Sequence, residues 1–123
     1  MKLKEVSVMT INTVEAFLSM ITVFQDHDNC MFYFEIQKKL VPINHIFRDQ
    51  NNEVCITYSD YLNKETLKLK EIKKKLSSKY DNHDLLYYKG LLNGIEIITG
   101  LDFYEDACYY NDKEKIIVYK LPV

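Results

Sequence analysis

The chain has 123 residues, of which 47% are hydrophobic and 28% charged, and a formal net charge of −2. This length and balance predict a single folded domain over residues 1–123 and argue against a disordered chain. No apolar run reaches the roughly 18 residues that a membrane-spanning helix needs, and the basic start MKLKEVSV lacks the apolar core of a signal peptide, so we expect a cytoplasmic protein with no membrane partner.

The numbers of arginine and cysteine residues limit the functions that the protein could have. Arg48 is the only arginine, and lysine supplies the other basic side chains. This bias, together with abundant Ile, Asn and Tyr, suggests an A+T-rich genome. Because arginine is the preferred side chain for guanine edges, its scarcity argues against sequence-specific DNA recognition. The three cysteines, Cys30, Cys55 and Cys108, are widely spaced, which favours buried free thiols over disulfides or a metal clip.

The chain is expected to begin with a short segment of open assignment, followed by a helix. Val6 and Val8 alternate with polar neighbours, which fits either a short edge strand or a poorly ordered lead-in over residues 1–8. Residues 12–25 predict a helix, because Asn12 and Glu15 have the spacing of a capping box. The apolar residues that follow recur at helical spacing, and they are Val14, Phe17, Leu18, Ile21 and Phe24.

A β-meander is predicted next. Residues 30–37 alternate apolar and polar side chains, as a half-buried strand does. Two further strands are expected, LVPINHIF at residues 40–47 and EVCITY at residues 53–58, joined by a turn at RDQNN. Pro42 cannot donate a ladder hydrogen bond, so the second strand should lie at an edge there or contain a bulge.

Residues 9–58 carry one resemblance to a known group of proteins. The segments MTINTVEAFL, FYFEI, LVPI and NNEVCI resemble a small helix-plus-meander module found in short phage and mobile-element proteins. The resemblance implies a genomic neighbourhood more than a mechanism, and it does not extend beyond residue 60.

Two more helices are predicted over residues 61–100 as an antiparallel hairpin. The first, at residues 63–80, has a narrow apolar stripe and many lysines. The second, at residues 81–100, holds all three glycines. Gly90 and Gly94 would lie on one helix face and allow another backbone to approach closely, while Gly100 would end the helix. Whether that glycine face packs internally or meets a partner chain stays open, as does the oligomeric state.

The remaining segment, residues 101–123, combines acidic and aromatic side chains and ends in a strand. KIIVYKL is strongly β-prone, and Pro122 stops further pairing. The predicted fold is therefore a two-layer α+β domain in the order α-β-β-β-α-α-β, with three helices on an antiparallel sheet of three to four strands. The last strand should join the sheet of the meander.

Chemical motifs for catalysis or cofactor binding are missing from the sequence. No nucleophile motif and no glycine-rich phosphate loop occur, so we expect no catalytic residues, no cofactor and no enzyme activity. His27 and Cys30 have metal-ligand spacing, and Cys55 could be a third ligand, but a surface turn beside a buried cysteine is the favoured interpretation. His83 and Asp84 resemble a metal-site dipeptide, although an acid at a helix start also complements the helix dipole.

Two function classes follow from these patterns. The favoured hypothesis is a non-enzymatic phage or mobile-element protein that binds and inhibits a host protein with a basic surface. A CRISPR effector is one candidate target, since the chain resembles anti-CRISPR inhibitors as a class, which are short and often acidic. The residues expected to contact that partner are Asp102, Tyr104, Glu105, Asp106, Tyr109 and Tyr110. The alternative is a nucleic-acid-associated regulator that uses the lysine-rich helix at residues 64–79, with contacts from Lys70, Lys73 and Lys74.

Overall fold

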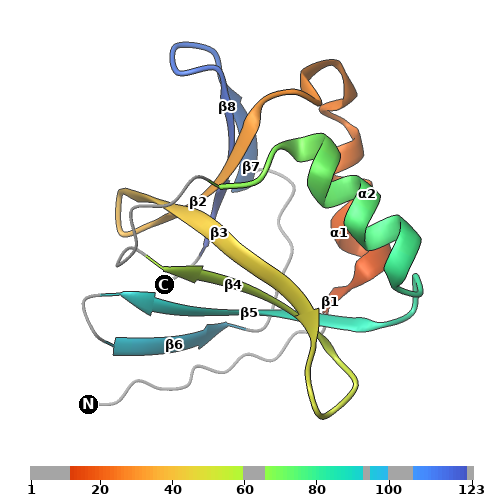
Figure 1. Ribbon diagram of the computed structural model, residues 1–123. Coiled ribbons are helices and arrows are strands. Elements are labelled where there is room, and N and C mark those ends of the chain that lie inside the picture. The colour runs from red at the N-terminus through yellow and green to blue at the C-terminus, as the bar shows by residue number, and fades with distance from the viewer. Residues whose placement is uncertain (1–11, 60–65, 93–94, 100–106, 122–123) are drawn as a thin grey trace.

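The computed structural model describes residues 12–59, 66–92, 95–99 and 107–121, and shows two α-helices beside a curved, mixed β-sheet (Figure 1). The helices are α1 (Val14–Thr22) and α2 (Leu69–Lys79), and a short 3-10 helix, η1 (Gln25–His27), follows α1. The strands are β1 (Asn12–Thr13), β2 (Met31–Ile36), β3 (Lys39–Arg48), β4 (Val54–Ser59), β5 (Leu85–Leu92), β6 (Ile95–Thr99), β7 (Cys108–Asn111) and β8 (Ile116–Lys120).

The sheet corrects the predicted fold. Its strand order is β1-β5-β4-β3-β2-β8-β7, with β6 also paired to β5. The β4–β5 and β2–β8 pairs are parallel, and the other pairs are antiparallel. The chain is an α+β protein, but the expected antiparallel sheet of three to four strands with three helices is wrong, because the second half of the chain supplies strands where helices were predicted.

The predicted helix over residues 81–100 is the main error. Its central part is a β-hairpin in which β5 and β6 pair antiparallel. Along β5, Leu86 and Tyr88 are buried whereas Leu85 and Leu91 are exposed, which is a period of two. The pairing of Leu92 with Ile95 places only residues 93 and 94 between the strands, and they are Asn-Gly, a dipeptide typical of two-residue hairpin turns.

Gly90 was expected to allow a close approach on a helix face. It does have a close neighbour, but Gly90 lies in a β-strand and the neighbour is a side chain of the adjacent strand. A Cβ atom on Gly90 would lie 1.8 Å from Cε1 of Tyr58, its register partner on β4. The tyrosine ring therefore occupies the space above this glycine. Gly94 and Gly100 lie outside the described residues, as do residues 1–8.

The first half of the chain follows its prediction closely. α1 and the antiparallel β2–β3–β4 meander are confirmed, although Thr13 rather than Asn12 caps α1 by accepting a hydrogen bond from the N–H of Ala16. The predicted bulge near Pro42 is also confirmed, between Ile43 and His45. In the second half, α2 confirms a helix at the lysine-rich segment, and β8 joins the sheet of the meander by pairing with β2.

The bulge lets β3 take part in two sheet halves. Residues 39–42 of β3 pair with β2, and residues 43–48 pair with β4. Where β2 and β3 separate, the hydroxyl of Thr66 accepts a hydrogen bond from the N–H of Ile43 (2.8 Å) and donates one to the carbonyl of Phe32 (2.5 Å). This buried hydroxyl satisfies two backbone groups that the ladder leaves unpaired.

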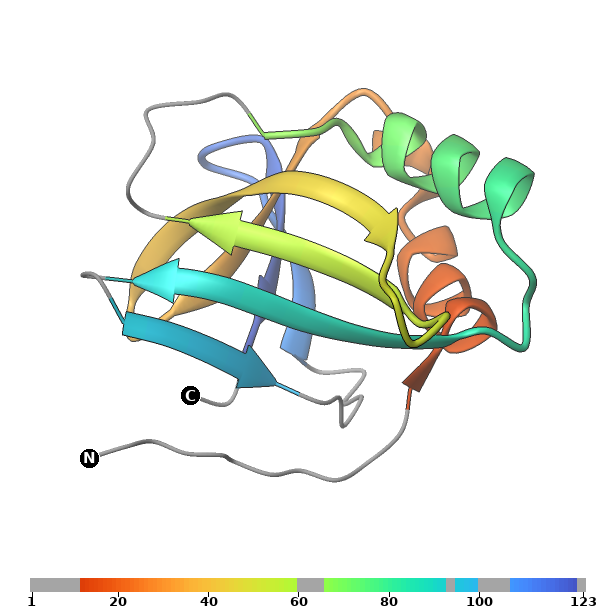
Figure 2. The same ribbon diagram turned by 60° about the horizontal axis from the view of Figure 1, so that its bottom comes forward.

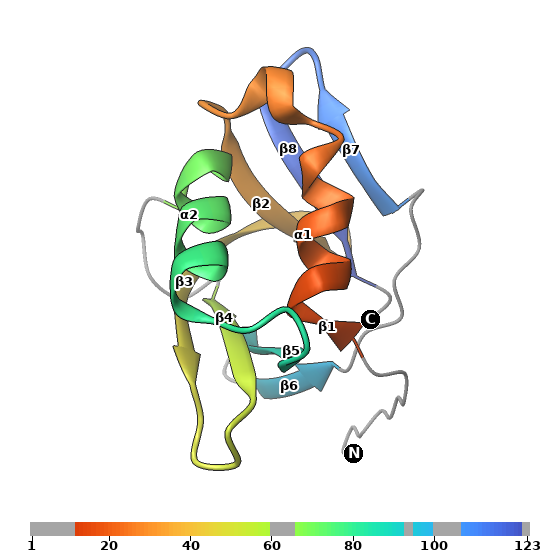
Figure 3. The same cartoon turned by 90° about the vertical axis from the view of Figure 1, so that its right-hand side faces the viewer.

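The curved sheet surrounds an aromatic core. Figure 2 shows β3, β4 and β5 side by side with the helices at one end, and Figure 3 shows α1 and α2 lying next to each other in front of the strands. Inside, Phe34 and Tyr88 have ring centroids 4.8 Å apart, and Phe17 of α1 contacts Tyr88 edge-on. Such offset and edge-on aromatic contacts add to the burial of apolar area.

The described elements divide into two units with the same connectivity. The first unit comprises α1, β2, β3 and β4, and the second comprises α2, β5, β6, β7 and β8. In each unit a helix precedes a strand, α1 before β2 and α2 before β5. Each unit then ends in an antiparallel pair of strands, β3–β4 in the first and β7–β8 in the second. The strand that follows the helix in one unit pairs in parallel with the last strand of the other, as β2 does with β8 and β5 with β4.

Backbone contacts at the two helix starts repeat the same pattern. The N–H of Val14 donates to the carbonyl of Asp84, and the N–H of Glu15 donates to that of Asn82. At α2, the N–H groups of Leu69 and Lys70 donate to the carbonyls of Cys30 and Asp28 in the same order. The buried faces of the helices also match in spacing, with Val14, Phe17 and Ile21 on α1 and Leu69, Ile72 and Leu76 on α2. The fold therefore has an approximate two-fold symmetry.

One difference breaks this symmetry. In the first unit the single strand β3 pairs with both β2 and β4, and so joins the two sheet halves. In the second unit two strands take the place of that single strand: β6 pairs with β5, and β7 pairs with β8. In the sequence, Asp102, Tyr104, Glu105 and Asp106 fall between these two strands, whereas Tyr109 and Tyr110 belong to β7.

Candidate functional site

The strongest candidate for a binding surface is a row of side chains on the outer face of β2, β8 and β7. Tyr33 on β2 lies beside Val118 on β8, and Val118 lies beside Tyr109 on β7. Their strand neighbours Phe32, Phe34, Ile117 and Tyr119 point into the core, so these three side chains point outward. We call Tyr33, Val118 and Tyr109 the tyrosine row.

Both ends of the tyrosine row are accessible. Tyr109 is 39% exposed and Tyr33 is half-buried, while Val118 between them is fully buried. Beside the row, Pro42 pairs with Tyr33, and Leu40 is 43% exposed. The result is an aromatic and aliphatic surface, which is typical of protein-binding patches.

The two phenol groups of the row differ in their contacts. The hydroxyl of Tyr109 donates to Oε1 of Glu35 at 3.0 Å. Burial and the neighbouring Glu35 carboxylate both raise the pKa of Tyr109, so it stays a neutral donor at physiological pH. Tyr33 is half-buried, and its hydroxyl makes no hydrogen bond with any other described residue.

The structure separates the two tyrosines that the sequence placed at one surface. Tyr110 follows Tyr109 on β7 and points to the other face, where its ring stacks on His27 with centroids 3.8 Å apart and an interplanar angle of 9°. It is half-buried against the core. The other predicted contacts, Asp102, Tyr104, Glu105 and Asp106, lie outside the described residues.

The equivalent row in the other half of the fold is built in a similar way. Phe47 on β3, Cys55 on β4 and Tyr87 on β5 are register neighbours, like the members of the tyrosine row. The hydroxyl of Tyr87 donates to Oδ2 of Asp49 at 2.7 Å, so this side chain reaches across β4 past the fully buried Cys55. Burial raises the pKa of the Cys55 thiol. The Tyr87–Asp49 bond resembles the Tyr109–Glu35 bond, which passes Val118 in the same way. Phe47, 42% exposed, presents an open ring in this row.

Arg48 organises a polar cluster at the end of the β3–β4 hairpin. Its guanidinium donates to Oδ2 of Asp84 at 2.8 Å and to the carbonyl of Asn52 at 3.2 Å, and it lies 5.2 Å from the ring centre of Tyr80. These contacts join the β3–β4 hairpin to the loop between α2 and β5, so the cluster is structural rather than a ligand site.

The lysine-rich helix offers only part of the predicted nucleic-acid surface. Lys73 forms an ion pair with Asp28 at 2.7 Å, which neutralises one of the three predicted contact residues. Lys70 and Lys74 are exposed and form no ion pair with another described residue. The acid of the helix, Glu71, accepts a hydrogen bond from the N–H of Lys68 at the helix start.

The described residues contain no group of three or more His, Cys, Asp or Glu side chains that could hold a metal ion. His27 and Cys30 do not converge with Cys55, because His27 stacks on Tyr110 and Cys30 packs against the core. Asp84 of the His83–Asp84 dipeptide is paired with Arg48. Among the described helices, none is long and apolar enough to cross a bilayer.

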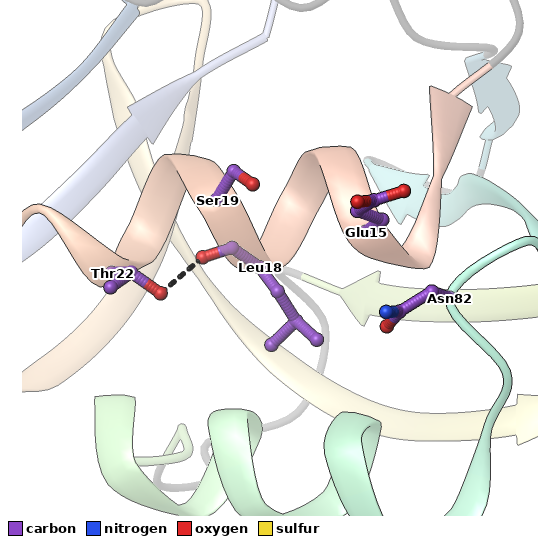
Figure 4. Close-up of a pocket in the computed structure, with 5 residues that line it drawn as sticks. All are labelled: Glu15, Leu18, Ser19, Thr22 and Asn82. Carbon is purple, nitrogen blue, oxygen red and sulfur yellow. Dashed lines mark hydrogen bonds between the residues drawn. The ribbon is translucent and has the colours of Figure 1, made fainter.

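A shallow groove of about 390 Å³ lies along α1 and is lined by Glu15, Leu18, Ser19, Thr22 and Asn82. Figure 4 shows Leu18 pointing from α1 toward α2, with Asn82 approaching from the loop that follows α2. The hydroxyl of Thr22 donates to the carbonyl of Leu18 at 2.6 Å, and the carbonyl of Asn82 accepts from Glu15. Four of its five lining residues are exposed, so the groove is open to solvent and is a weaker candidate than the tyrosine row.

Comparison with known proteins gives no identification, because no family model, no curated protein and no solved structure matches the chain. The function must therefore be argued from the tyrosine row and its surroundings.

Proposed function

We propose that this chain is a non-enzymatic binding protein that attaches to another protein through the tyrosine row. The supporting observation is the exposed aromatic face at Tyr33 and Tyr109, next to the place where the second unit departs from the first. Tyrosine gives a large contact area at a low cost in conformational entropy, and it is enriched among residues that dominate binding energy. In repeated folds, such departures from the repeat often mark the binding face.

The partner class follows from the sequence. The resemblance of residues 9–58 to phage and mobile-element modules favours a host protein as the target, and its inhibition as the outcome. The expectation that the target has a basic surface depends on Asp102, Glu105 and Asp106, which lie outside the described residues. It stays a prediction, as does a CRISPR effector as the target.

A pair of matched variants tests this proposal. Tyr109→Ala removes a ring from the tyrosine row, while Phe47→Ala removes the equivalent ring from the opposite row at nearly the same exposure (39% against 42%). Affinity capture from the native host, followed by mass spectrometry, identifies the partner, and titration of that partner measures each variant. We expect Tyr109→Ala to weaken binding by about 1–2 kcal/mol, and Phe47→Ala to leave it unchanged.

If the wild type and Tyr109→Ala bound the partner with equal affinity, the tyrosine row would not be the contact surface. The nucleic-acid alternative has one observation against it, the Lys73–Asp28 ion pair. A gel shift with generic DNA and RNA at low salt is its direct test, and retardation that disappears on charge reversal of Lys70 and Lys74 would favour it over the protein-binding proposal.

A further inference from the structure

The strand β7 has an edge that is open to further pairing. Among the described residues it pairs with β8 on one side, and no strand pairs on its other side. Natural proteins usually protect such edges with charged side chains or proline. The sequence of β7 is Cys-Tyr-Tyr-Asn, which has neither, whereas the preceding strand β6, which pairs only with β5 among the described strands, carries Glu96, 57% exposed at its side chain and paired with Lys89.

The fold already uses short added strands at the equivalent edges of β5 and β2. The two residues of β1, Asn12 and Thr13, pair with the start of β5. At the start of β2, the carbonyl of Leu67 accepts from the N–H of Phe32, and Lys68 forms a bridge with Met31. In both places an extended segment that precedes a helix covers the unpaired backbone. No described segment does this for β7.

The two faces of β7 determine which side chains an added strand would meet. On the outer face it would continue the tyrosine row beside Tyr109, where apolar or aromatic side chains fit. On the other face it would lie next to the stacked rings of Tyr110 and His27. Because side chains alternate along a strand, the matching partner is an extended segment with an apolar residue at every second position.

We infer that β7 accepts an extended segment of the partner protein as an additional strand of the sheet. This inference rests on the proposed function, since it specifies how the partner binds beside the tyrosine row. Backbone hydrogen bonds along the edge would supply affinity, and the side chain next to Tyr109 would supply specificity.

The test uses the full chain and short random peptides selected on it by display. Each enriched peptide is synthesised, and amide hydrogen exchange of residues 108–111 is measured with and without it. In strand addition, the amides of β7 that point away from β8 become protected by roughly tenfold or more, while those that face β8 change little. This alternating pattern needs no variant and would not arise from side-chain docking alone.

A pair of variants adds a second measurement. Tyr109→Lys places a charge on the edge strand and should weaken peptide binding by about tenfold or more. Phe47→Lys makes the same change on the equivalent row of the other sheet half and should leave binding unchanged.

The outcomes separate this inference from the proposed function. If the identified host partner loses affinity with Tyr109→Ala but does not protect the β7 amides, the tyrosine row is the contact surface and strand addition is wrong. Peptides without alternating apolar residues, or a failure to enrich any peptide, would also contradict strand addition. Concentration-dependent protection of β7 without any peptide, accompanied by dimers in sedimentation, would assign the edge to a second copy of the chain instead.

Discussion

Arg48, the only arginine in the chain, connects the end of the β3–β4 hairpin to the loop between α2 and β5. It bonds the carboxylate of Asp84 before β5 and the carbonyl of Asn52 in the β3–β4 turn, and it lies over the ring of Tyr80 after α2. Lysine could not replace it, because a single ammonium group cannot reach two acceptors and an aromatic face in a fixed plane. Composition alone singled out Arg48, but nothing in the sequence indicated what it contacts.

The Arg48–Asp84 pair makes stability depend on acid pH. The hydrogen bond from Arg48 lowers the pKa of Asp84 below its usual value of 3.8. The stabilisation is therefore complete above pH 3.8 and is lost as the pH falls through the lower pKa of the folded state. We expect Asp84→Asn to flatten the dependence of the melting temperature on pH in this acid range.

Asp112→Asn is the matched control for that experiment. Asp112 is 87% exposed at its side chain, and its contact with Lys115 is longer, at 3.6 Å. This substitution should leave the pH dependence close to that of the wild type. A wild-type protein whose stability did not fall in acid more steeply than that of Asp84→Asn would contradict the assignment.

The turn between β2 and β3 offers a second prediction for a single residue. Gln37 and Lys38 both have positive φ angles, 53° and 68°, as a two-residue hairpin turn requires. This conformation is unfavourable for side chains other than glycine, asparagine and aspartate. Lys38→Gly should raise the free energy of unfolding by about 1 kcal/mol in urea titrations. The same change at the adjacent strand residue Lys39 should lower it, because glycine weakens a strand.

At the scale of elements, Gly90 explains how β4 and β5 lie next to each other. The ring of Tyr58 fills the space above Gly90, where a Cβ atom would overlap it at 1.8 Å. Tyr58 is almost fully buried and also contacts Phe34, at a ring distance of 5.3 Å. The ring therefore has little room to move away from a larger residue at position 90.

We expect Gly90→Ala to destabilise the protein by about 1–3 kcal/mol, measured by urea unfolding. The double variant Gly90→Ala with Tyr58→Leu should cost less than the sum of the two single changes, because the smaller side chain removes the overlap. Leu91→Ala, at the next and exposed position of β5, should change stability by about 0.5 kcal/mol. Additive effects in the double variant would show that the ring is not what limits position 90.

Elements whose pairing partners are adjacent in the sequence could be predicted, and elements whose partners are distant could not. The meander β2–β3–β4 was predictable, since its alternation is clear and each strand pairs with the next. Residues 81–100 were not, because Leu85, Tyr88, Leu92 and Ile95 recur at helical spacing, whereas the strand buries Leu86 and Tyr88 and exposes Leu85. The deciding contact is the parallel pairing of β5 with β4, which no local pattern indicates. The Asn-Gly dipeptide at residues 93 and 94 was the signal that could have corrected the error.

The candidate site was predictable only in part. Tyr109 was named from the acidic-aromatic composition, and it lies in the tyrosine row. Its neighbours Tyr33 and Val118 could not be found, because they come from β2 and β8, and the parallel pairing of these strands is a long-range contact. A helix was correctly predicted in the lysine-rich segment, but it begins at Leu69, later than expected. The ion pair between Lys73 and Asp28 depends on the tertiary fold.

For the whole molecule, the two units cannot be separated without breaking the sheet. Each unit supplies its last strand to the other, through the β2–β8 and β4–β5 pairs. A comparison of the chain with itself could have pointed to this arrangement, since MFYFEI of β2 and LLYYKG of β5 occupy equivalent places and both contain aromatic residues at their centres. The shared strands predict that the two units unfold together.

We therefore expect one cooperative unfolding transition. Circular dichroism and tyrosine fluorescence should give the same midpoint in urea, because no unit keeps a complete sheet when the other unfolds. Tyrosine fluorescence is suitable because the chain has ten tyrosines and no tryptophan. Separate midpoints for the two probes would mean that one unit holds its structure alone.

The parallel pairing of β2 with β8 also bears on how the protein emerges from the ribosome. β2 is synthesised early, but its partner follows only after β3, β4, α2, β5, β6 and β7. Until then the meander exposes the edge of β2 and the aromatic side chains Phe32 and Phe34, so the nascent chain has an unfinished apolar surface for most of its translation. A premature stop before β8 should therefore give an aggregating product, recovered in the insoluble fraction, rather than a smaller folded protein.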